Sequence, residues 1–542
     1  LSFLPYLLQG ATAASFEEHI YSKAPPPSWV KKYNFPLNPV EPQPSQVNLQ
    51  YLLIDTQRHW EEKTTYCHYA VKALTQNGVE DISTLHIDFD PSHRQVVVHF
   101  IRVFRDGQWL DRLENSLYHL LQREKELENN LYNGDLSLVY LLGDIRKNDI
   151  IEYSYSIVGA TPIFDSYFTD CIYLQWKTAI EQVAYRFLAP PDLVFSTRLV
   201  NTNIEPRIVD LSPSMREWTW EAMATPPYVE EPDEPIWYNF PSRIQLSQYK
   251  TWQEFAKHIA PLYTSPKQTS AEMKALVNTW KETTQDPRER ALLALRFVQD
   301  EVRYFGLEKG IRSYVAHDPQ LVLERRFGDC KDKTLLLHTL LQLMDISSTP
   351  ALVHSTQGKR LAEVLPLPFA FNHMVLYIQI EKTPYWVDPT DYLQGGSLLT
   401  TPFPNYHWAL LLSEHTTALT PLPENLLPHP TEIDTSYLLT SEDSAALTIK
   451  KVFHSFQADN LRKNLARTGK EEMSKNQLTE MQKRYVEAIQ TSPPHMQDDR
   501  EDNTFTLVES YTIPTCNLPD KKTIELFPYT TKNRLNKRPL LI

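Results

Sequence analysis

A single cysteine stands where a helix is predicted to begin in the middle of the chain. Gly328 and Asp329 form a turn immediately before Cys330. The apolar residues that follow have helical spacing: Leu335, Leu336, Leu337, Leu340, Leu341 and Met344. Unpaired backbone N–H groups give a helix N-terminus partial positive charge, which favours a thiolate over a thiol. The pattern therefore predicts Cys330 as a nucleophile.

A base and an orienting group follow the cysteine in order. His373 lies in a β-rich run, residues 371–380, whose apolar side chains fall on one face. Asp388 comes 15 positions later, at the end of a short run with aromatic and β-branched residues. Two neighbouring antiparallel strands can present this histidine and aspartate side by side. We therefore predict a catalytic set of Cys330, His373 and Asp388.

These motifs carry a family resemblance. Gly-Asp-Cys-Lys-Asp-Lys at 328–333, Asn-His at 372–373 and Trp-Val-Asp-Pro-Thr at 386–390 resemble the transglutaminase-like superfamily of papain-type fold, in particular its bacterial branch with a β-rich front module. The catalytic resemblance covers residues 245–415. The resemblance of the front module, of the domain-of-unknown-function type, rests on Phe104–Gly107 and Gly143–Tyr153.

The resemblance implies an α+β fold, with a papain/transglutaminase-like core flanked by two β-rich, sandwich-like modules. It also implies thiol-dependent acyl transfer on the amide bonds of a protein or peptide, without a cofactor. Peptide hydrolysis and transfer to an amine use the same three residues, so the sequence leaves both open. The backbone N–H of Cys330 is the expected oxyanion donor, and Tyr304 is a weakly indicated side-chain partner.

Other interpretations of the same residues stay open. The chain could be a non-catalytic interaction protein that binds a surface partner through its β-rich modules. A metal site is disfavoured, because the sequence has no Cys-x-x-Cys, no His-Glu-x-x-His and no evident fourth ligand. His338 and His354 are poorer bases. The first lies more than two helical turns beyond the cysteine, and the second lacks a following Asp on a strand.

Composition bounds the partners and the number of domains. A chain of 542 residues is too long for one core and predicts about three domains. The net charge of −13 argues against a nucleic-acid partner, which requires a basic surface. No apolar run is long enough to span a bilayer. The oligomeric state is left undetermined.

The predicted organisation has five parts. Residues 1–14 resemble the end of a signal peptide, which predicts export to the periplasm or beyond. The remaining parts are a proline-rich lead (15–50), a β-rich N-terminal module (51–235), the catalytic core (245–415) and a β-rich C-terminal module (425–542) that we expect to be truncated. Leucines at helical spacing predict a helix within 112–130, and a long polar helix is predicted over 458–490.

Three further cysteines accompany Cys330. Cys67 and Cys171 both lie in β-type runs of the front module, which makes them the favoured disulfide pair. The alternative is that these two and Cys516 are all buried thiols, since four cysteines in a chain of this length do not form a disulfide framework.

Overall fold

The computed structural model describes residues 19–39, 47–125, 127–230, 234–266, 268–424 and 431–514. The predicted signal remnant at 1–14, Cys516 and the expected truncation of the last module lie outside these ranges. The chain forms two compact units. Unit 1 comprises Leu1–His258, Phe305–Val315 and Arg360–Ala370, and unit 2 comprises Ile259–Tyr304, Ala316–Lys359 and Phe371–Ile542. No helix of the described ranges is long and apolar enough to cross a membrane.

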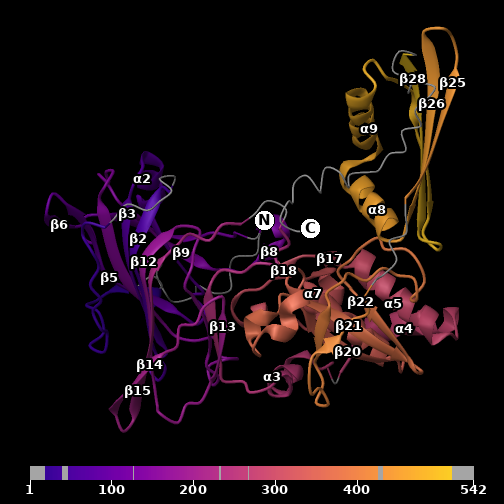
Figure 1. Ribbon diagram of the computed structural model, residues 1–542. Coiled ribbons are helices and arrows are strands. Elements are labelled where there is room, and N and C mark those ends of the chain that lie inside the picture. The colour runs from indigo at the N-terminus through magenta and orange to yellow at the C-terminus, as the bar shows by residue number, and fades with distance from the viewer. Residues whose placement is uncertain are drawn as a thin grey trace. The chain divides into compact units, whose positions relative to one another are not determined.

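A large, mostly antiparallel sheet forms the body of unit 1 (Figure 1). Its described strands run in the order β1-β5-β10-β3-β2-β12-β15-β14, and β6 pairs with β5. Their bounds are β1 Tyr21–Lys23, β2 Leu49–His59, β3 Thr64–Ala73, β5 Gln95–Arg105, β6 Gln108–Asp111, β10 Ile150–Val158, β12 Ala179–Ala189, β14 Arg207–Ser212 and β15 Met215–Thr225. In β5 a bulge at His99 shifts the inward alternation from Val98 to Ile101.

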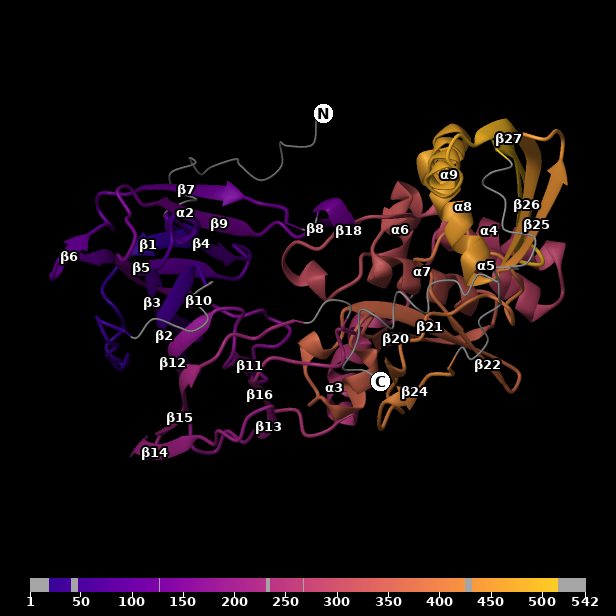
Figure 2. The same cartoon turned by 45° about the horizontal axis from the view of Figure 1, so that its top comes forward.

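Two smaller sheets pack against this one and enclose separate cores. Figure 2 shows the first beside β5; its strands are β4 Thr84–Phe89, β9 Leu136–Leu141 and β7 Leu117–Gln122. The second consists of β11 Thr169–Tyr173, β16 Arg243–Ser247 and β13 Ser196–Val200. Short elements complete the unit: α2 Gln76–Ile82, η1 Leu127–Asn129, β8 Leu131–Tyr132, β18 Gly306–Leu307, η3 Gly310–Ser313 and η5 Pro368–Ala370.

One expectation for this unit was wrong. The helix predicted within 112–130 is strand β7, which pairs with β9 along its length. Its leucines fit helical spacing, but Leu117 and Leu121 are exposed, so they mark no buried helical face. The proline-rich lead contributes to the fold: β1 adds to the sheet beside β5, and Tyr21 and Tyr33 are buried.

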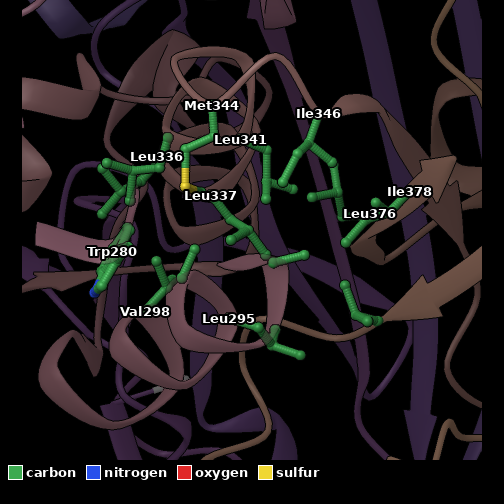
Figure 3. Packing of buried hydrophobic residues seen from close by; sticks show 14 of the residues in the cluster. Trp280, Leu295, Val298, Leu336, Leu337, Leu341, Met344, Ile346, Leu376 and Ile378 are labelled. Carbon is green, nitrogen blue, oxygen red and sulfur yellow. The ribbon is translucent and has the colours of Figure 1, made fainter. Parts of the chain in front are cut away.

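Unit 2 places helices against an antiparallel sheet. The sheet order is β22 Thr383–Val387, β21 His373–Ile380, β20 Ser347–Val353, β23 Trp408–Leu411 and β24 Thr420–Pro421. The principal helices are α4 Ala271–Thr283, α5 Pro287–Glu301, α6 Pro319–Arg325 and α7 Cys330–Gln342. Figure 3 shows their common core, in which Leu337 of α7 lies among Trp280, Val298 and Leu376. Short elements are β17 Arg303–Tyr304, β19 Phe327–Gly328 and η2 Ala260–Tyr263. Two further elements, α3 Trp252–Ile259 and η4 Gly358–Glu363, each contain residues of both units.

The described rear segment, for which a separate module was predicted, falls within unit 2. It forms a sheet of β25 Glu432–Leu439, β26 Ser444–His454, β28 Thr504–Pro514 and β27 Ile489–Asp499. Two helices, α8 Phe456–Thr468 and α9 Lys470–Arg484, lie along one of its faces (Figure 1). The single helix predicted over 458–490 is thus two helices, because Gly469 between them has φ +81°.

Candidate active site

The turn before Cys330 fixes the start of helix α7. Asp329 is the N-cap, and its Oδ1 accepts hydrogen bonds from the backbone N–H groups of Lys331 (2.8 Å) and Asp332 (3.0 Å). Asp332 bonds back to the N–H of Asp329, which completes a capping box. Cys330 is consequently the first residue of the helix, as the sequence predicted.

The cap is anchored by charges behind it. The Asp332 carboxylate accepts hydrogen bonds from Arg325 Nη2 at 2.7 Å and from the backbone N–H of His317 at 2.7 Å. Burial raises the pKa of Asp332, but the bonds and charges of His317 and Arg325 prevail and hold it below its usual value. Lys331 Nζ pairs with Asp329 Oδ2 at 2.9 Å. The loop that carries the cysteine is therefore ionically fixed on both sides.

One backbone donor remains at the cysteine itself. The N–H groups of Lys331 and Asp332 are taken by the cap, and that of Lys333 bonds to the Asp329 carbonyl. Within the described part of the chain, no acceptor contacts the N–H of Cys330. Tyr304 lies opposite Gly328 in the short parallel pair of β17 and β19, which brings this half-buried residue close to the same turn.

Strands β21 and β22 bring His373 and Asp388 together. His373 begins β21, Asp388 follows the last residue of β22, and these strands are antiparallel neighbours. Nε2 of His373 donates to Asp388 Oδ2 at 2.8 Å. The Cys330 side chain lies beside the same imidazole and acts to raise its pKa. The structure thus places all three predicted residues at one point.

The Asp388 carboxylate has four hydrogen-bond donors. Besides His373, Oδ2 accepts from Tyr406 Oη at 2.9 Å, and Oδ1 accepts from the N–H and hydroxyl of Thr390 at 2.9 and 2.6 Å. Burial acts to raise the pKa of Asp388. The charge and hydrogen bond of His373, with the bonds from Thr390, outweigh burial and hold the pKa well below its usual range.

His373 is shifted in the opposite direction. Burial acts to lower its pKa, but the charge and hydrogen bond of Asp388 and the contact with Cys330 raise it well above its usual value. An imidazolium is therefore stabilised beside the sulfur.

Two further polar side chains, Gln299 and Lys333, support the region around Asp388. Gln299 Nε2, on α5, donates to the Asp388 backbone carbonyl at 2.9 Å. The buried Lys333, on α7, donates to the carbonyl of Val302 at 2.6 Å. Val302 is the residue that follows the last residue of α5. Burial lowers the pKa of this lysine to about 8 although Asp388 acts to raise it. The end of α5 is thereby fixed under the histidine–aspartate pair.

Sequence reasoning missed several of these supporting residues. Tyr406 lies in a proline-flanked loop before β23, where nothing in the local pattern indicated a role. Gln299 is an ordinary polar position on a predicted helix. Lys333 belongs to the quoted motif, but a lysine after a cysteine gives no sign that it will be buried. His338, set aside as a base, bonds instead to Ser348 at 2.8 Å.

The front cysteines are unpaired. Cys67 and Cys171 are free thiols, so the favoured disulfide is not formed; Cys67 is buried, as the alternative predicted, whereas Cys171 is only partly buried. Burial raises the pKa of Cys67 to about 12 and that of Cys171 to about 11. Burial prevails at both thiols, although the charge of Arg243 acts to lower the pKa of Cys171.

Comparisons with known proteins identify a shared fold. Residues 61–229 match a family described as a domain of unknown function with solved structure, DUF3857. A "putative protease" from Parabacteroides distasonis is similar in structure, with a TM-score of 0.56, 10% identity and coverage of 86% of this chain and 93% of that one. This likeness shows a shared fold across most of both chains. None of the curated proteins matches the chain.

A second solved structure matches over a smaller part. The periplasmic domain of TgpA from Pseudomonas aeruginosa is 11% identical and covers 54% of this chain and 86% of that one, with a TM-score of 0.18. That score is too low to support a conclusion about the fold.

Proposed function

We propose that unit 2 transfers acyl groups from amide bonds of a protein or peptide through a thioester on Cys330. The observation that carries the proposal is the Asp388–His373 hydrogen bond of 2.8 Å, with the Cys330 side chain beside the same imidazole. A nucleophile, a base and an orienting carboxylate in this order are what acyl transfer through a thiol requires. A structural core has no need of all three.

The proposed reaction begins with proton transfer from the thiol to His373. Because Nε2 of the imidazole is bonded to Asp388, Nδ1 is the nitrogen that exchanges a proton with the sulfur. The thiolate attacks the amide carbonyl, and the N–H of Cys330 at the helix start stabilises the oxyanion. His373 then gives its proton to the departing amine, which leaves a thioester on the enzyme.

The acyl-enzyme has two possible acceptors. With water, His373 removes a proton from the attacking water and the products are an acid and the free thiol. With an amine, the same base removes a proton from nitrogen and a new amide forms. The residues described at the site serve either acceptor, so product analysis has to distinguish hydrolysis from transamidation.

Three conservative variants test the proposal: Cys330→Ala, His373→Gln and Asp388→Asn. Glutamine retains a donor toward Asp388, which avoids leaving a buried charge without a partner. Cleavage of fluorescein-labelled casein and incorporation of dansylcadaverine into casein report the two reactions. We expect each variant to lose at least about a thousand-fold in rate, and double variants to lose little more than single ones.

The matched control is Cys171→Ala, which removes a thiol without touching the site. It should keep wild-type rates, and all variants should melt within a few degrees of the wild type. The competing function is the non-catalytic interaction protein predicted as an alternative. Folded triad variants with unchanged rates, or a folded wild type without either amide reaction, would establish that alternative.

A further inference from the structure

Unit 1 contains a cavity of about 480 Å³, a volume within the range of small-molecule sites. Small-molecule sites typically occupy about 300–1,000 Å³. The cavity lies between β2, β3 and β12 of the large sheet and β11 of a small one, and residues from 305–315 and 360–370 contribute to its wall. None of Cys330, His373 and Asp388 lines it. It therefore offers a function distinct from acyl transfer.

A planar charged pair forms the polar part of the wall. Arg58 Nη1 donates to Asp170 Oδ2 at 2.8 Å and to the Thr169 carbonyl at 3.2 Å. Tyr185 Oη donates to the same carboxylate oxygen at 2.5 Å. The side chains of Arg58 and Asp170 are 27% and 26% exposed, so the pair is reachable from the cavity. A guanidinium has five N–H donors in one plane, which leaves donors for a ligand.

Aromatic rings form the apolar part of the wall. Trp176 packs edge-on against Tyr51 with ring centroids 5.1 Å apart, and Tyr69 stacks on Tyr153 at the same separation. Both Trp176 and Tyr69 line the cavity. Because each packs against a neighbouring ring, their positions are set before a ligand arrives. Tyr173 and Phe369 also line it and are 46% and 47% exposed. Fixed rings provide contact area at little cost in conformational entropy.

We propose that this cavity binds a neutral oligosaccharide. A sugar ring has apolar C–H faces, which pack on aromatic rings, and a rim of hydroxyls, which exchange hydrogen bonds with planar polar groups. The Arg58–Asp170 pair supplies both donors and acceptors, and threonine hydroxyls at Thr56, Thr65 and Thr161 add further partners. The charges of the pair balance each other, and the exposed Arg94 at the wall adds a guanidinium that can donate to sugar hydroxyls.

Other ligand classes fit the wall less well. An acyl chain would remove the Arg58–Asp170 pair from water without replacing its hydrogen bonds, which is costly. A peptide that extended the sheet at β11 would need free backbone groups on that strand. There the Thr169 carbonyl is bonded to Arg58, and the Cys171 N–H is bonded to Asp170 at 2.8 Å. A phosphate-bearing ligand calls for several unpaired cations, whereas Arg58 is neutralised by Asp170 and Arg94 is the one other cation among the described residues of the wall.

Calorimetric titration of the full chain with maltotriose, cellotriose and triacetylchitotriose tests the proposal. We expect at least one of them to bind with one molecule per chain. Phe369→Ala and Arg58→Gln should each weaken that binding at least ten-fold. Phe369 is half exposed, so its variant remains informative if the arginine variant fails to fold. Tyr238→Ala, which removes an exposed ring outside the cavity, is the matched control and should bind as the wild type.

The Cys330→Ala variant should also bind the sugar with unchanged affinity, so failure of the catalytic proposal would not affect this one. Three results would overturn the saccharide site. They are an absence of binding by all three sugars, binding that neither cavity variant weakens, and tighter binding of dodecanoate or penta-alanine than of any sugar.

Discussion

At the scale of single residues, charge rather than exposure distinguishes Cys330 from the other described thiols. Cys330 is 7% exposed and Cys67 is 8% exposed, so solvent access is nearly equal. Their surroundings differ. Cys330 begins a helix and lies beside a histidine whose pKa is raised, whereas burial raises the pKa of the Cys67 thiol itself to about 12.

Alkylation should therefore follow a fixed order. At neutral pH we expect iodoacetamide to modify Cys330 first, Cys171 more slowly and Cys67 last, because the pKa values of the latter two are raised to about 11 and about 12. Peptide mass spectrometry of timed samples measures the order. Similar rates at the three thiols in the folded protein would contradict it.

The pH dependence of turnover should depend on Asp388. Its charge and hydrogen bond oppose the effect of burial and hold the pKa of His373 above the usual value of about 6.5. The reactive imidazolium is lost as pH rises through this raised pKa. Asp388→Asn removes the negative charge and leaves burial, which lowers the pKa of His373, so the alkaline limb of the kcat/KM profile should move to lower pH. Asp345→Asn, a change at a fully exposed position, should leave the limb in place.

At the scale of elements, the helix and the two strands that carry the candidate site follow from sequence periodicity. Helix α7 and strand β21 begin close to where capping, spacing and β-type composition predict. Periodicity failed where it was unsupported by burial, as in β7, whose leucines are largely exposed. The roles of Tyr406, which bonds to Asp388, and of Lys333, which bonds to the end of α5, could not be predicted. They depend on contacts between elements far apart in the sequence.

The apolar face of α7 should be the most sensitive element of unit 2. Leu337 is fully buried among residues of α4, α5 and β21, so alanine there leaves a cavity (Figure 3). We expect a loss of about 2–5 kcal/mol in the free energy of unfolding, measured by urea titration. Leu321→Ala on α6, at a position 45% exposed, should change it by less than about 0.5 kcal/mol. Equal effects of the two substitutions would show that α7 does not form the centre of the core.

At the scale of the whole chain, unit 2 joins its rear segment to the loop that follows Asp388. Lys463 of α8 pairs with Asp391, and the Gly395 N–H donates to Asp459 Oδ1 at 2.9 Å. Arg500 Nη2 pairs with Asp300 at 2.6 Å. The backbone carbonyl of Arg500 accepts a hydrogen bond from the Gly396 N–H at 2.8 Å. The rear segment thus holds the loop at 391–396, which closely follows Asp388 of the proposed triad in sequence.

Removing these attachments should loosen the rear contact without disabling the cysteine. In a Lys463→Met, Arg500→Met double variant we expect faster hydrogen exchange at the Gly396 amide, by roughly ten-fold, since each partly exposed pair contributes up to about 1 kcal/mol. Lys475→Met, which removes an exposed pair within α9, is the matched control and should leave exchange at Gly396 unchanged. The alkylation rate of Cys330 should stay at the wild-type value, because the cap at Asp329 and the neighbouring His373 belong to other elements. Unchanged exchange at Gly396 would contradict the proposed attachment, and a parallel loss of Cys330 reactivity would show instead that the rear segment helps to position the triad.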